Sequence, residues 1–440
     1  MAATNARVAR FASDLAEDPA GALNSLRADL QTAGGPFVER VSAAEVDVTF
    51  VYVADVTSVQ LRTSLLRLAQ PKIAAPMERI AGSDVWHLTV RAPSTVAVAY
   101  SFLCDPPAVG ETLAEMMEVY SDPQAAERFQ VAIETASRVD PFNPGRMPRE
   151  VDFATGRAVD SVLLLPDSTY RPDTADAPAP PLDEHELDGR RISVYQPRSA
   201  GPADSLPLVV LLDGDVLLRG ELHRRLDVAV EAGLLPAVRV VFWHNLTLTS
   251  RMAEMACNPA LADALADRLL PLLREKYGVP EDRKHRVIGG FSMGGLATAH
   301  IALARPDAFG AAMPLSAVLW FTPDPGAEPG EWLTRQYRQA PVTDTAFYVS
   351  AGQLEDVAVD APGVAPGTTL VSAARTFYDT LQAKGYDVRG FAEIPSGHEL
   401  INVYQSLQGG LSALLPRPSR CAPGGSDPPP LRAAPRKATV

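Results

Sequence analysis

The sequence predicts an α/β protein in which a doubly wound, mostly parallel sheet follows a small N-terminal β-sandwich with flanking helices. Three observations lead to this prediction. Short runs of alternating polarity stand close together before residue 105, which is typical of a sandwich. After residue 190, apolar strand-like runs alternate with helical stretches, which indicates a parallel sheet. A Gly-x-Ser-x-Gly motif lies between one such strand and one such helix.

Length, charge and cysteine usage narrow the class of protein. The 440 residues correspond to about two to three domains. A net charge of -13 makes nucleic acids and anionic membranes poor partners. We expect neither a membrane span nor export, because the chain has no run of about 18 apolar residues and no apolar signal-peptide core. The widely spaced Cys104, Cys257 and Cys421 show neither metal-ligand spacing nor a disulfide framework, which favours the cytoplasm.

The first part of the chain is expected to form a helical segment and then a sandwich. Apolar residues recur near helical spacing within 1–44, until Gly34-Gly35-Pro36 ends the run. The sandwich is expected over 45–150, with a helical insertion from Glu111 to Ser137. Its predicted strands are Val46–Val53, Val59–Arg62, Trp86–Arg91 and Val96–Phe102.

The second part is expected to hold a linker and first strand (151–187) and an α/β domain (188–415). The linker is rich in Pro, Asp and Ala. The Pro-rich, basic tail (416–440) is expected to be disordered. The predicted strands of the α/β domain are 190–195, 206–212, 237–242, 287–291, 346–351 and 388–394, and its predicted helices are 221–232, 259–277, 296–304 and 399–415.

The motif Gly290-Phe291-Ser292-Met293-Gly294 predicts a nucleophilic serine at a sharp strand-to-helix turn. Glycines two residues either side of Ser292 allow the close approach of backbone that such a turn needs. The N–H of Met293 would form half of an oxyanion hole, and the helix N-terminus would add partial positive charge. The alternative is a small-residue turn with a capping serine, but the flanking strand and helix favour the nucleophile.

A serine nucleophile needs a histidine base and a carboxylate that orients it. In this fold the order along the chain is serine, acid, histidine. Of the two histidines after Ser292, His300 lies inside the following helix, so His398 is the candidate base. The acid should follow the strand 346–351, which leaves Glu355 or Asp356.

Several motifs of the chain resemble the bacterial enterochelin (enterobactin) esterases, within the esterase-D-like α/β-hydrolases. The resemblance covers most of residues 45–410 and extends over both predicted domains, which makes it more specific than the serine motif. The motifs that carry it are Asp84-Val85-Trp86-His87-Leu88, Asp140-Pro141-Phe142-Asn143-Pro144, Leu211-Leu212-Asp213-Gly214, Arg251-x-x-Glu254-Met255 followed by Asn258, Gly290 to Gly295, Ala351-Gly352-x-x-Glu355 and Gly397-His398-Glu399.

The resemblance implies a β-sandwich beside an α/β-hydrolase domain, and cytoplasmic cleavage of the serine trilactone of a catecholate siderophore. It favours Glu355 over Asp356 as the acid. It also implies that Arg251 lies near anionic groups of the substrate; pairing with Glu254 is the alternative. Trp320 could stack on an aromatic substrate or belong to the core.

Three departures from the family pattern fall near the expected site. Asp215-Val216 stands where the family usually has Glu and an aromatic residue, and Glu399 stands where it usually has Asp. Ala317 replaces a glycine in a run that ends at Trp320. The residues expected to carry the chemistry survive these changes, whereas two of the departures concern the expected substrate pocket.

The expected reaction is acyl transfer from a small-molecule ester, such as a ferric siderophore, to Ser292 and then to water. The second donor to the oxyanion would be the N–H of Gly214 or Asp215. We expect no metal or other cofactor, since iron would belong to the substrate. Two alternatives stay open: a hydrolase or acyltransferase acting on another ester or depsipeptide, and a non-catalytic binding protein.

Overall fold

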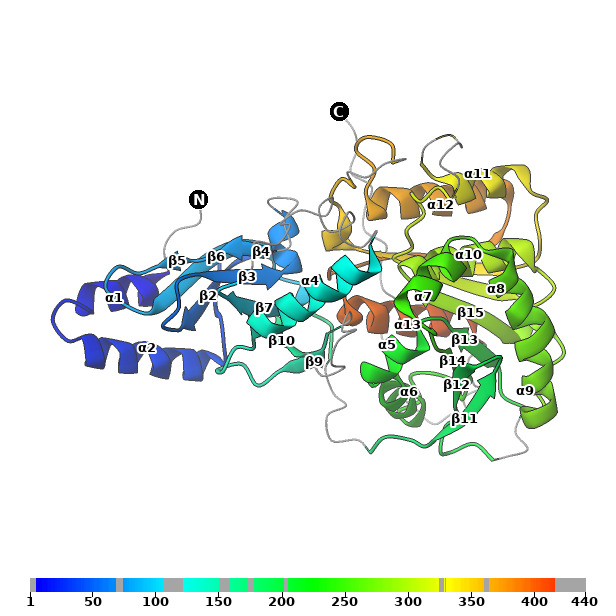
Figure 1. Ribbon diagram of the computed structural model, residues 1–440, viewed down its shortest axis with the longest axis horizontal. Coiled ribbons are helices and arrows are strands. Elements are labelled where there is room, and N and C mark those ends of the chain that lie inside the picture. Colours follow the sequence, from blue (N-terminus) through cyan, green and yellow to red (C-terminus); the bar gives the residue numbers. More distant parts are fainter. Residues whose placement is uncertain are drawn as a thin grey trace.

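The computed structural model describes residues 5–68, 74–106, 122–149, 159–171, 178–201, 205–323, 328, 330–359 and 364–415. These residues form an N-terminal pair of β-sheets with two helices at its outer end, and a larger α/β unit beside it (Figure 1). Residues 111–121 of the expected insertion and the tail 416–440 lie outside the described residues, and the rest of the insertion forms α4 (Pro123–Ala136). Within the described ranges, no helix combines the length and the apolar character needed to cross a bilayer.

The chain begins with two helices and then enters the first sheet. Asp18 caps α2 through a 2.9 Å bond from the N–H of Gly21, and Gly34 ends the helix in the left-handed region at φ 71°. The range 1–44 is not helical throughout, because Phe37–Arg40 pairs antiparallel with the next strand. The elements are α1 (Ala6–Asp14), α2 (Pro19–Ala33) and β1 (Phe37–Arg40).

Two antiparallel sheets pack face to face and confirm the predicted sandwich. Their strand orders are β1-β2-β6-β5 and β4-β3-β7-β10-β9, with β8 also pairing with β7. Alternate apolar residues from both sheets, such as Phe50, Leu61 and Phe102, share one buried cluster. The strands are β2 (Glu45–Val53), β3 (Val59–Thr63), β4 (Ala74–Pro76), β5 (Glu78–Arg79), β6 (Val85–Pro93), β7 (Ala97–Cys104), β8 (Ser137–Arg138), β9 (Arg146–Pro148) and β10 (Val159–Leu164).

The α/β unit is built on one twisted sheet of order β11-β12-β14-β13-β15-β16-β17-β18. All neighbours from β14 to β18 are parallel, whereas β11 and β12 are antiparallel. The predicted mostly parallel sheet is therefore confirmed. The strands are β11 (Leu182–Leu187), β12 (Arg190–Tyr195), β13 (Leu208–Leu211), β14 (Arg239–Trp243), β15 (Arg286–Phe291), β16 (Ala311–Leu315), β17 (Ala346–Gly352) and β18 (Asp387–Ile394).

The segment expected to be a linker and first strand, 151–187, contributes one strand to the sandwich and one to the large sheet. Its strand β10 buries Val162 and Leu163 and pairs with β7, so it belongs to the sandwich. Its strand β11 forms a hairpin with β12 across Asp188 and Gly189, whose φ angles are 53° and 76°. An Asp-Gly pair with both φ angles positive is typical of a two-residue hairpin, so this dipeptide could have predicted β11.

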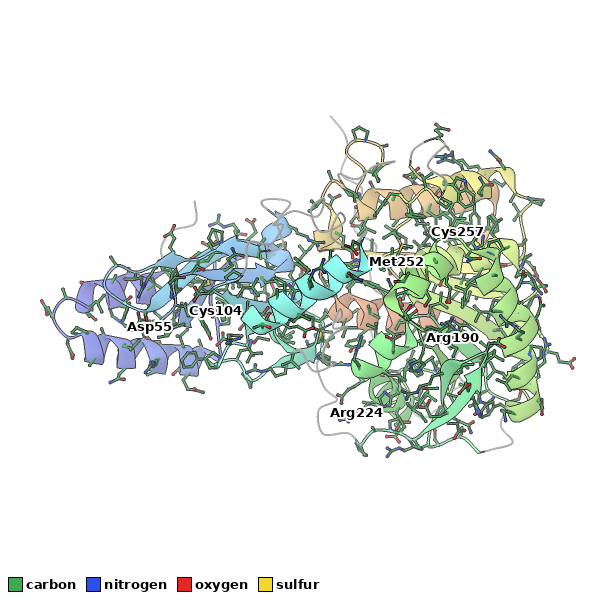
Figure 2. All side chains as sticks on the ribbon, in the orientation of Figure 1. Asp55, Cys104, Arg190, Arg224, Met252 and Cys257 are labelled. Carbon is green, nitrogen blue, oxygen red and sulfur yellow. The ribbon has the colours of Figure 1, made fainter. Side chains whose placement is uncertain are left out.

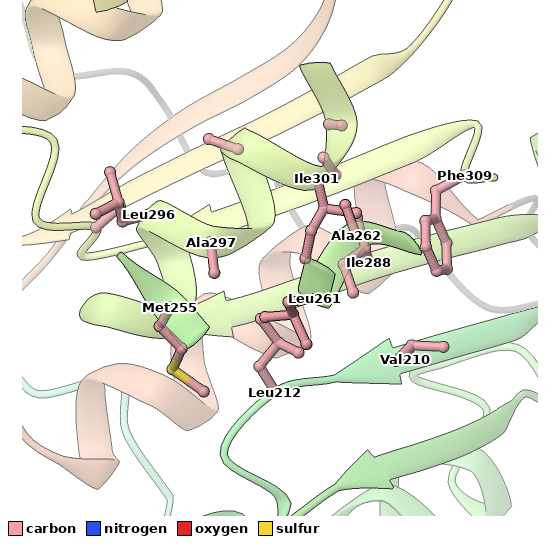
Figure 3. Close-up of a cluster of buried hydrophobic side chains, with 14 of the residues drawn as sticks. Val210, Leu212, Met255, Leu261, Ala262, Ile288, Leu296, Ala297, Ile301 and Phe309 are labelled. Carbon is pink, nitrogen blue, oxygen red and sulfur yellow. The ribbon is translucent and has the colours of Figure 1, made fainter. Parts of the chain in front are cut away.

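Helices cover both faces of the large sheet because strand side chains alternate between the faces. Val210 and Ile288 point to the face covered by α8 and α10, where they pack with Leu261 and Ile301 (Figure 3). Val209 and Val287 point to the other face, toward α6 and α13. The helices are α5 (Gly214–Arg219), α6 (Leu222–Glu231), α7 (Leu248–Met255), α8 (Pro259–Ala264), a π-helical turn (Leu265–Leu269), α9 (Leu270–Tyr277), α10 (Met293–Ala304), α11 (Trp332–Gln339), α12 (Leu370–Lys384) and α13 (Leu400–Leu414).

Two of the cysteines are described, and they lie far apart. Cys104 ends β7 in the sandwich and Cys257 follows α7 in the α/β unit (Figure 2). Both are free thiols. Burial raises the pKa of the Cys257 thiol to about 12, which keeps that thiol protonated and unreactive at neutral pH.

A short 3-10 turn, η4 (Gln353–Glu355), joins the two units. It follows β17 of the large sheet, yet Leu354 is only 2% exposed and belongs to the apolar cluster of the sandwich. There it shares the core with Leu65 and Val98. The end of β17 is therefore anchored in the N-terminal unit.

We predict that Leu354→Ala will lower the free energy of unfolding by about 2–5 kcal/mol, because it leaves a cavity where the two units meet. Urea denaturation followed by tryptophan fluorescence measures the change. The matched control is Leu234→Ala, a leucine that is 62% exposed, which should change stability by less than about 0.5 kcal/mol. Equal effects of the two substitutions would contradict a packed interface at Leu354.

Candidate active site

Ser292 stands in a strained turn between β15 and α10. Its φ of 59° and ψ of -120° are rare for a residue with a side chain, and such strain concentrates at functional sites. The turn has room for no side chain at Gly290, where an added Cβ would lie 2.4 Å from the carbonyl oxygen of Gly294. The N–H of Ser292 donates to the carbonyl of Leu315 at 3.0 Å, which ties the turn to the next strand of the sheet.

His398 and Glu355 lie in direct contact. The Nδ1 atom of His398 lies 2.6 Å from Oε1 of Glu355, and Glu355 is 1% exposed. The N–H of Gly352 donates to the other carboxylate oxygen at 2.6 Å, and Asn402 donates to Oε1 at 3.4 Å. Since an ionised carboxylate only accepts hydrogen bonds, this contact favours the tautomer with the proton on Nδ1 and a basic Nε2.

The imidazole lies beside the strand that leads to the serine. The ring of Phe291, the residue before Ser292, lies 4.4 Å from the ring of His398, centroid to centroid. The structure thus brings His398 beside the strand-to-helix turn of Ser292, here called the elbow, although 106 positions separate Ser292 from His398 in the sequence.

Asp356, the second candidate acid, faces a different partner. Its Oδ1 accepts a hydrogen bond from the hydroxyl of Thr369 at 2.9 Å, the residue that caps α12. The structure therefore pairs His398 with Glu355 and gives Asp356 a contact with the start of a helix.

The expected oxyanion donors lie at the first turns of two helices. Met293 begins α10, and Gly214 and Asp215 begin α5. The first N–H groups of a helix have no acceptor within the helix, so these positions suit a developing negative charge. The two turns are close, because a Cβ added to Gly294 would lie 3.1 Å from Oδ2 of Asp213.

Arg251 forms a two-point ion pair with Asp213. Its Nε and Nη2 lie 2.6 Å and 2.8 Å from the two carboxylate oxygens, and both side chains are largely buried. Glu254, which the sequence offers as an alternative partner of Arg251, instead pairs with Arg190 at 2.6 Å. The arginine on α7 therefore supports the turn at Asp213, where φ is 59°.

Asn245 completes this network from the loop after β14. Its Nδ2 donates to Asp213 at 2.7 Å and to Asp215 at 2.9 Å. A cavity of about 330 Å³ lies beside it, lined by Arg191, Asp215, Leu218, Arg219 and His244. Burial lowers the pKa of His244, which favours the neutral ring at neutral pH.

Trp320 lies in the buried segment after β16. It is 7% exposed and belongs to the apolar cluster between α10 and the large sheet. Its indole N–H has no hydrogen-bond partner among the residues that the structure describes. The backbone near it approaches the elbow, since the N–H of Val318 donates to the carbonyl of Ser292 at 3.3 Å.

Sequence reasoning missed two polar residues that hold the loops of the site. Asn402 on α13 donates to the hydroxyl of Ser316 at 2.9 Å and to the carbonyl of Gly397 at 3.0 Å, in addition to Glu355. Glu399 was considered only as a departure from the usual aspartate, yet it is buried. Their signal in the sequence is a pair of polar residues, Glu399 at the N-cap and Asn402 in the first turn, among the apolar residues that begin this helix.

Comparisons with known proteins agree with this architecture. The family model described as "Putative esterase" matches residues 187–410, and "Enterochelin esterase, N-terminal" matches residues 47–173. An iron(III) enterobactin esterase of Dickeya dadantii is 26% identical over 261 residues, which cover 56% of this chain and 58% of that protein. An iron(III) salmochelin esterase of Escherichia coli O6:H1 is 26% identical over 381 residues, which cover 79% of this chain and 86% of that protein.

Solved structures show the same fold. The ferric enterobactin esterase of Salmonella typhimurium superposes with a TM-score of 0.70 at 21% identity, covering 88% of this chain and 98% of that one. The enterobactin esterase of Shigella flexneri, crystallised in the presence of enterobactin, gives 0.67 at 21% identity, covering 87% and 96%. With the esterase model alone matching just over half of the 440 residues, the chain belongs to the enterochelin esterase family, with its N-terminal domain and its esterase domain.

Proposed function

We propose that this protein is a serine esterase that hydrolyses the trilactone of an enterobactin-type catecholate siderophore in the cytoplasm and so allows iron to be released. The observation that carries the catalytic part is the 2.6 Å contact between His398 and the buried Glu355, beside the strained turn of Ser292. The substrate class is supported by the relatives, whose names give iron(III) enterobactin and salmochelin esterases.

In the proposed acylation step, Oγ of Ser292 attacks an ester carbonyl carbon while Nε2 of His398 takes the hydroxyl proton. Glu355 keeps the imidazole in the required tautomer and stabilises its positive charge. The C–O ester bond then breaks, and His398 gives the proton to the leaving oxygen of the substrate's own serine unit. Water repeats the sequence on the acyl-serine, which releases the acid and restores Ser292.

The negative charge on the carbonyl oxygen is proposed to be held by the N–H of Met293 and by that of Gly214 or Asp215. Removal of one such donor typically costs about 3 kcal/mol of transition-state stabilisation. The ion pair between Arg251 and Asp213 supports the turn that carries the second donor. Trp320 is proposed to line the acyl side of the site, because Val318, two residues before it, bonds the carbonyl of Ser292.

We predict that the purified protein will convert iron-free and ferric enterobactin to linear dihydroxybenzoylserine products, and that Ser292→Ala will abolish the conversion. Mass-resolved chromatography measures both. A fluorophosphonate probe should label the wild type and leave the variant unlabelled. If enterobactin stays intact while the probe still labels Ser292, the siderophore assignment fails and another ester or an acyl acceptor becomes the substrate to seek.

We predict that Glu355→Gln will lower kcat by as much as about 10⁴-fold, because an amide can favour the wrong imidazole tautomer. Asp356→Asn is the matched control, and it should change kcat little because Asp356 bonds Thr369. Steady-state hydrolysis of p-nitrophenyl butyrate measures both variants. A larger loss in Asp356→Asn than in Glu355→Gln would reverse the assignment of the acid.

Experiment can separate two alternative roles of Arg251, support of the turn at Asp213 and binding of substrate. If it supports the turn, Arg251→Gln leaves the Asp213 carboxylate buried without its cation and should destabilise the protein by about 3 kcal/mol. Asp213→Asn in the same chain should then recover part of the loss. If instead it binds substrate, urea denaturation should show little change and KM should rise for anionic esters but not for neutral ones. We predict the first pattern.

A further inference from the structure

In one sheet of the N-terminal sandwich, the first residues of strand β7 are unpaired on the side that faces β3. Strand β3 pairs with β7 only from Val59 to Thr63, opposite Cys104 to Tyr100. The chain then turns into the 3-10 helix η1 (Ser64–Leu68). The first residues of β7, including Ala97 and Ala99, therefore have no β3 residue opposite them, and buried backbone N–H groups need an acceptor.

The loop that carries His398 supplies these acceptors. The N–H of Ala97 donates to the carbonyl oxygen of Pro395 at 3.0 Å, and the N–H of Ala99 donates to Oε2 of Glu399. The other carboxylate oxygen of Glu399 lies 3.3 Å from the N–H of Gly397. The loop thus takes the place that β3 vacates along β7, with His398 between its two points of attachment.

The fit between loop and sandwich is close. A Cβ added to Gly397 would lie 2.2 Å from Oγ of Ser64 and 2.3 Å from its Cβ, so only glycine allows this approach. The hydroxyl of Ser64 also hydrogen-bonds the Glu399 side chain. Glu399 is 8% exposed, and burial of a carboxylate is unfavourable unless donors compensate for lost water.

We propose that the N-terminal sandwich positions the catalytic histidine, with Glu399 as the residue that fastens the His398 loop to β7. This inference rests on the proposed function and adds to it a role for the N-terminal domain in the reaction. The acid is held from the same side, because Leu354, next to Glu355, lies in the sandwich core. Both members of the triad that lie on loops are therefore anchored by one domain.

Several charged or polar groups surround Glu399. Asp160 on β10 repels its charge, and Asp160 is itself paired with Arg149 and Arg62. Burial is the main cause that raises the pKa of Glu399 from 4.5 to about 7, against hydrogen bonds from Ala99, Ser64 and Gly397 that lower it. His398 is its neighbour in the chain. The backbone N–H donors favour the ionised carboxylate, although burial opposes it.

This opposition predicts that Glu399→Gln will change the pH dependence of stability and will lower activity. Because the pKa is higher in the folded state, the neutral carboxyl stabilises the fold fully below pH 4.5, and this contribution is lost as pH rises through about 7. The Tm of the variant relative to wild type should therefore increase between pH 5 and pH 8. A glutamine cannot accept from both Ala99 and Gly397, so the loop should shift and kcat should fall.

The activity test uses the full chain and p-nitrophenyl butyrate at pH 8. We expect kcat of Glu399→Gln to fall by about 10- to 100-fold with KM within about twofold, as for a misplacement of about 1 Å in a catalytic group. The matched control is Glu393→Gln, whose partly exposed carboxylate pairs with Arg375 on the surface of β18 and α12. This control should keep wild-type kcat.

A second pair of variants tests the contact from both domains. Gly397→Ala should lower kcat by about 10-fold or more, because the new methyl group collides with Ser64. Ser64→Gly in the same chain removes the collision and should restore most of the activity, although the two positions lie in different domains. Rescue of this kind locates the cause of the loss at the contact between Gly397 and Ser64, across the interface of the two domains.

The outcomes separate this inference from the proposed function. A wild type that neither hydrolyses the ester nor reacts with a fluorophosphonate would remove the hydrolase and the positioning role together. An active wild type with unchanged kcat in both Glu399→Gln and Gly397→Ala would overturn the positioning role alone. Reduced kcat in both variants, with rescue by Ser64→Gly, would support it.

Discussion

The contact between His398 and the buried carboxylate of Glu355 is the interaction on which the rest of the site depends. Neither residue lies on a strand or a long helix, so neither position follows from the sheet alone. Hydrogen bonds from Gly352 and Asn402 hold the carboxylate, and the ring of Phe291 packs on the imidazole. The large sheet provides the serine, whereas loops provide its partners.

Those loops are supported by the N-terminal sandwich, which gives a physical reason for the two-domain architecture. The strand β7 has backbone donors that β3 leaves uncovered, and the segment around His398 accepts from them. Leu354 fills the sandwich core beside Glu355. A catalytic loop held by a separate rigid sheet loses less conformational entropy at each turnover than a free loop does.

Charge in the site is balanced locally. The chain is acidic overall, yet Arg251, Arg190 and Arg149 each bind a carboxylate in largely buried pairs. Such pairs add little net stability but fix geometry, because removal of one partner leaves a buried charge. Glu399 differs from the partners of these arginines, since its hydrogen bonds come from the backbone N–H groups of Ala99 and Gly397 and from the hydroxyl of Ser64.

The sequence alone determined the two fold classes, the serine at its turn and the single histidine beyond the elbow that could reach it, because these depend on local periodicity, glycine spacing and chain order. It left Glu355 and Asp356 unresolved without the family resemblance, missed the Asp188-Gly189 hairpin, and gave no role to Asn402 or Glu399. The contacts of these residues appear only in the tertiary structure, where Glu355 meets His398 and Asp356 meets Thr369. Hydrogen-bond partners and burial arise between segments far apart in the chain, and no local pattern records which loop will meet which strand edge.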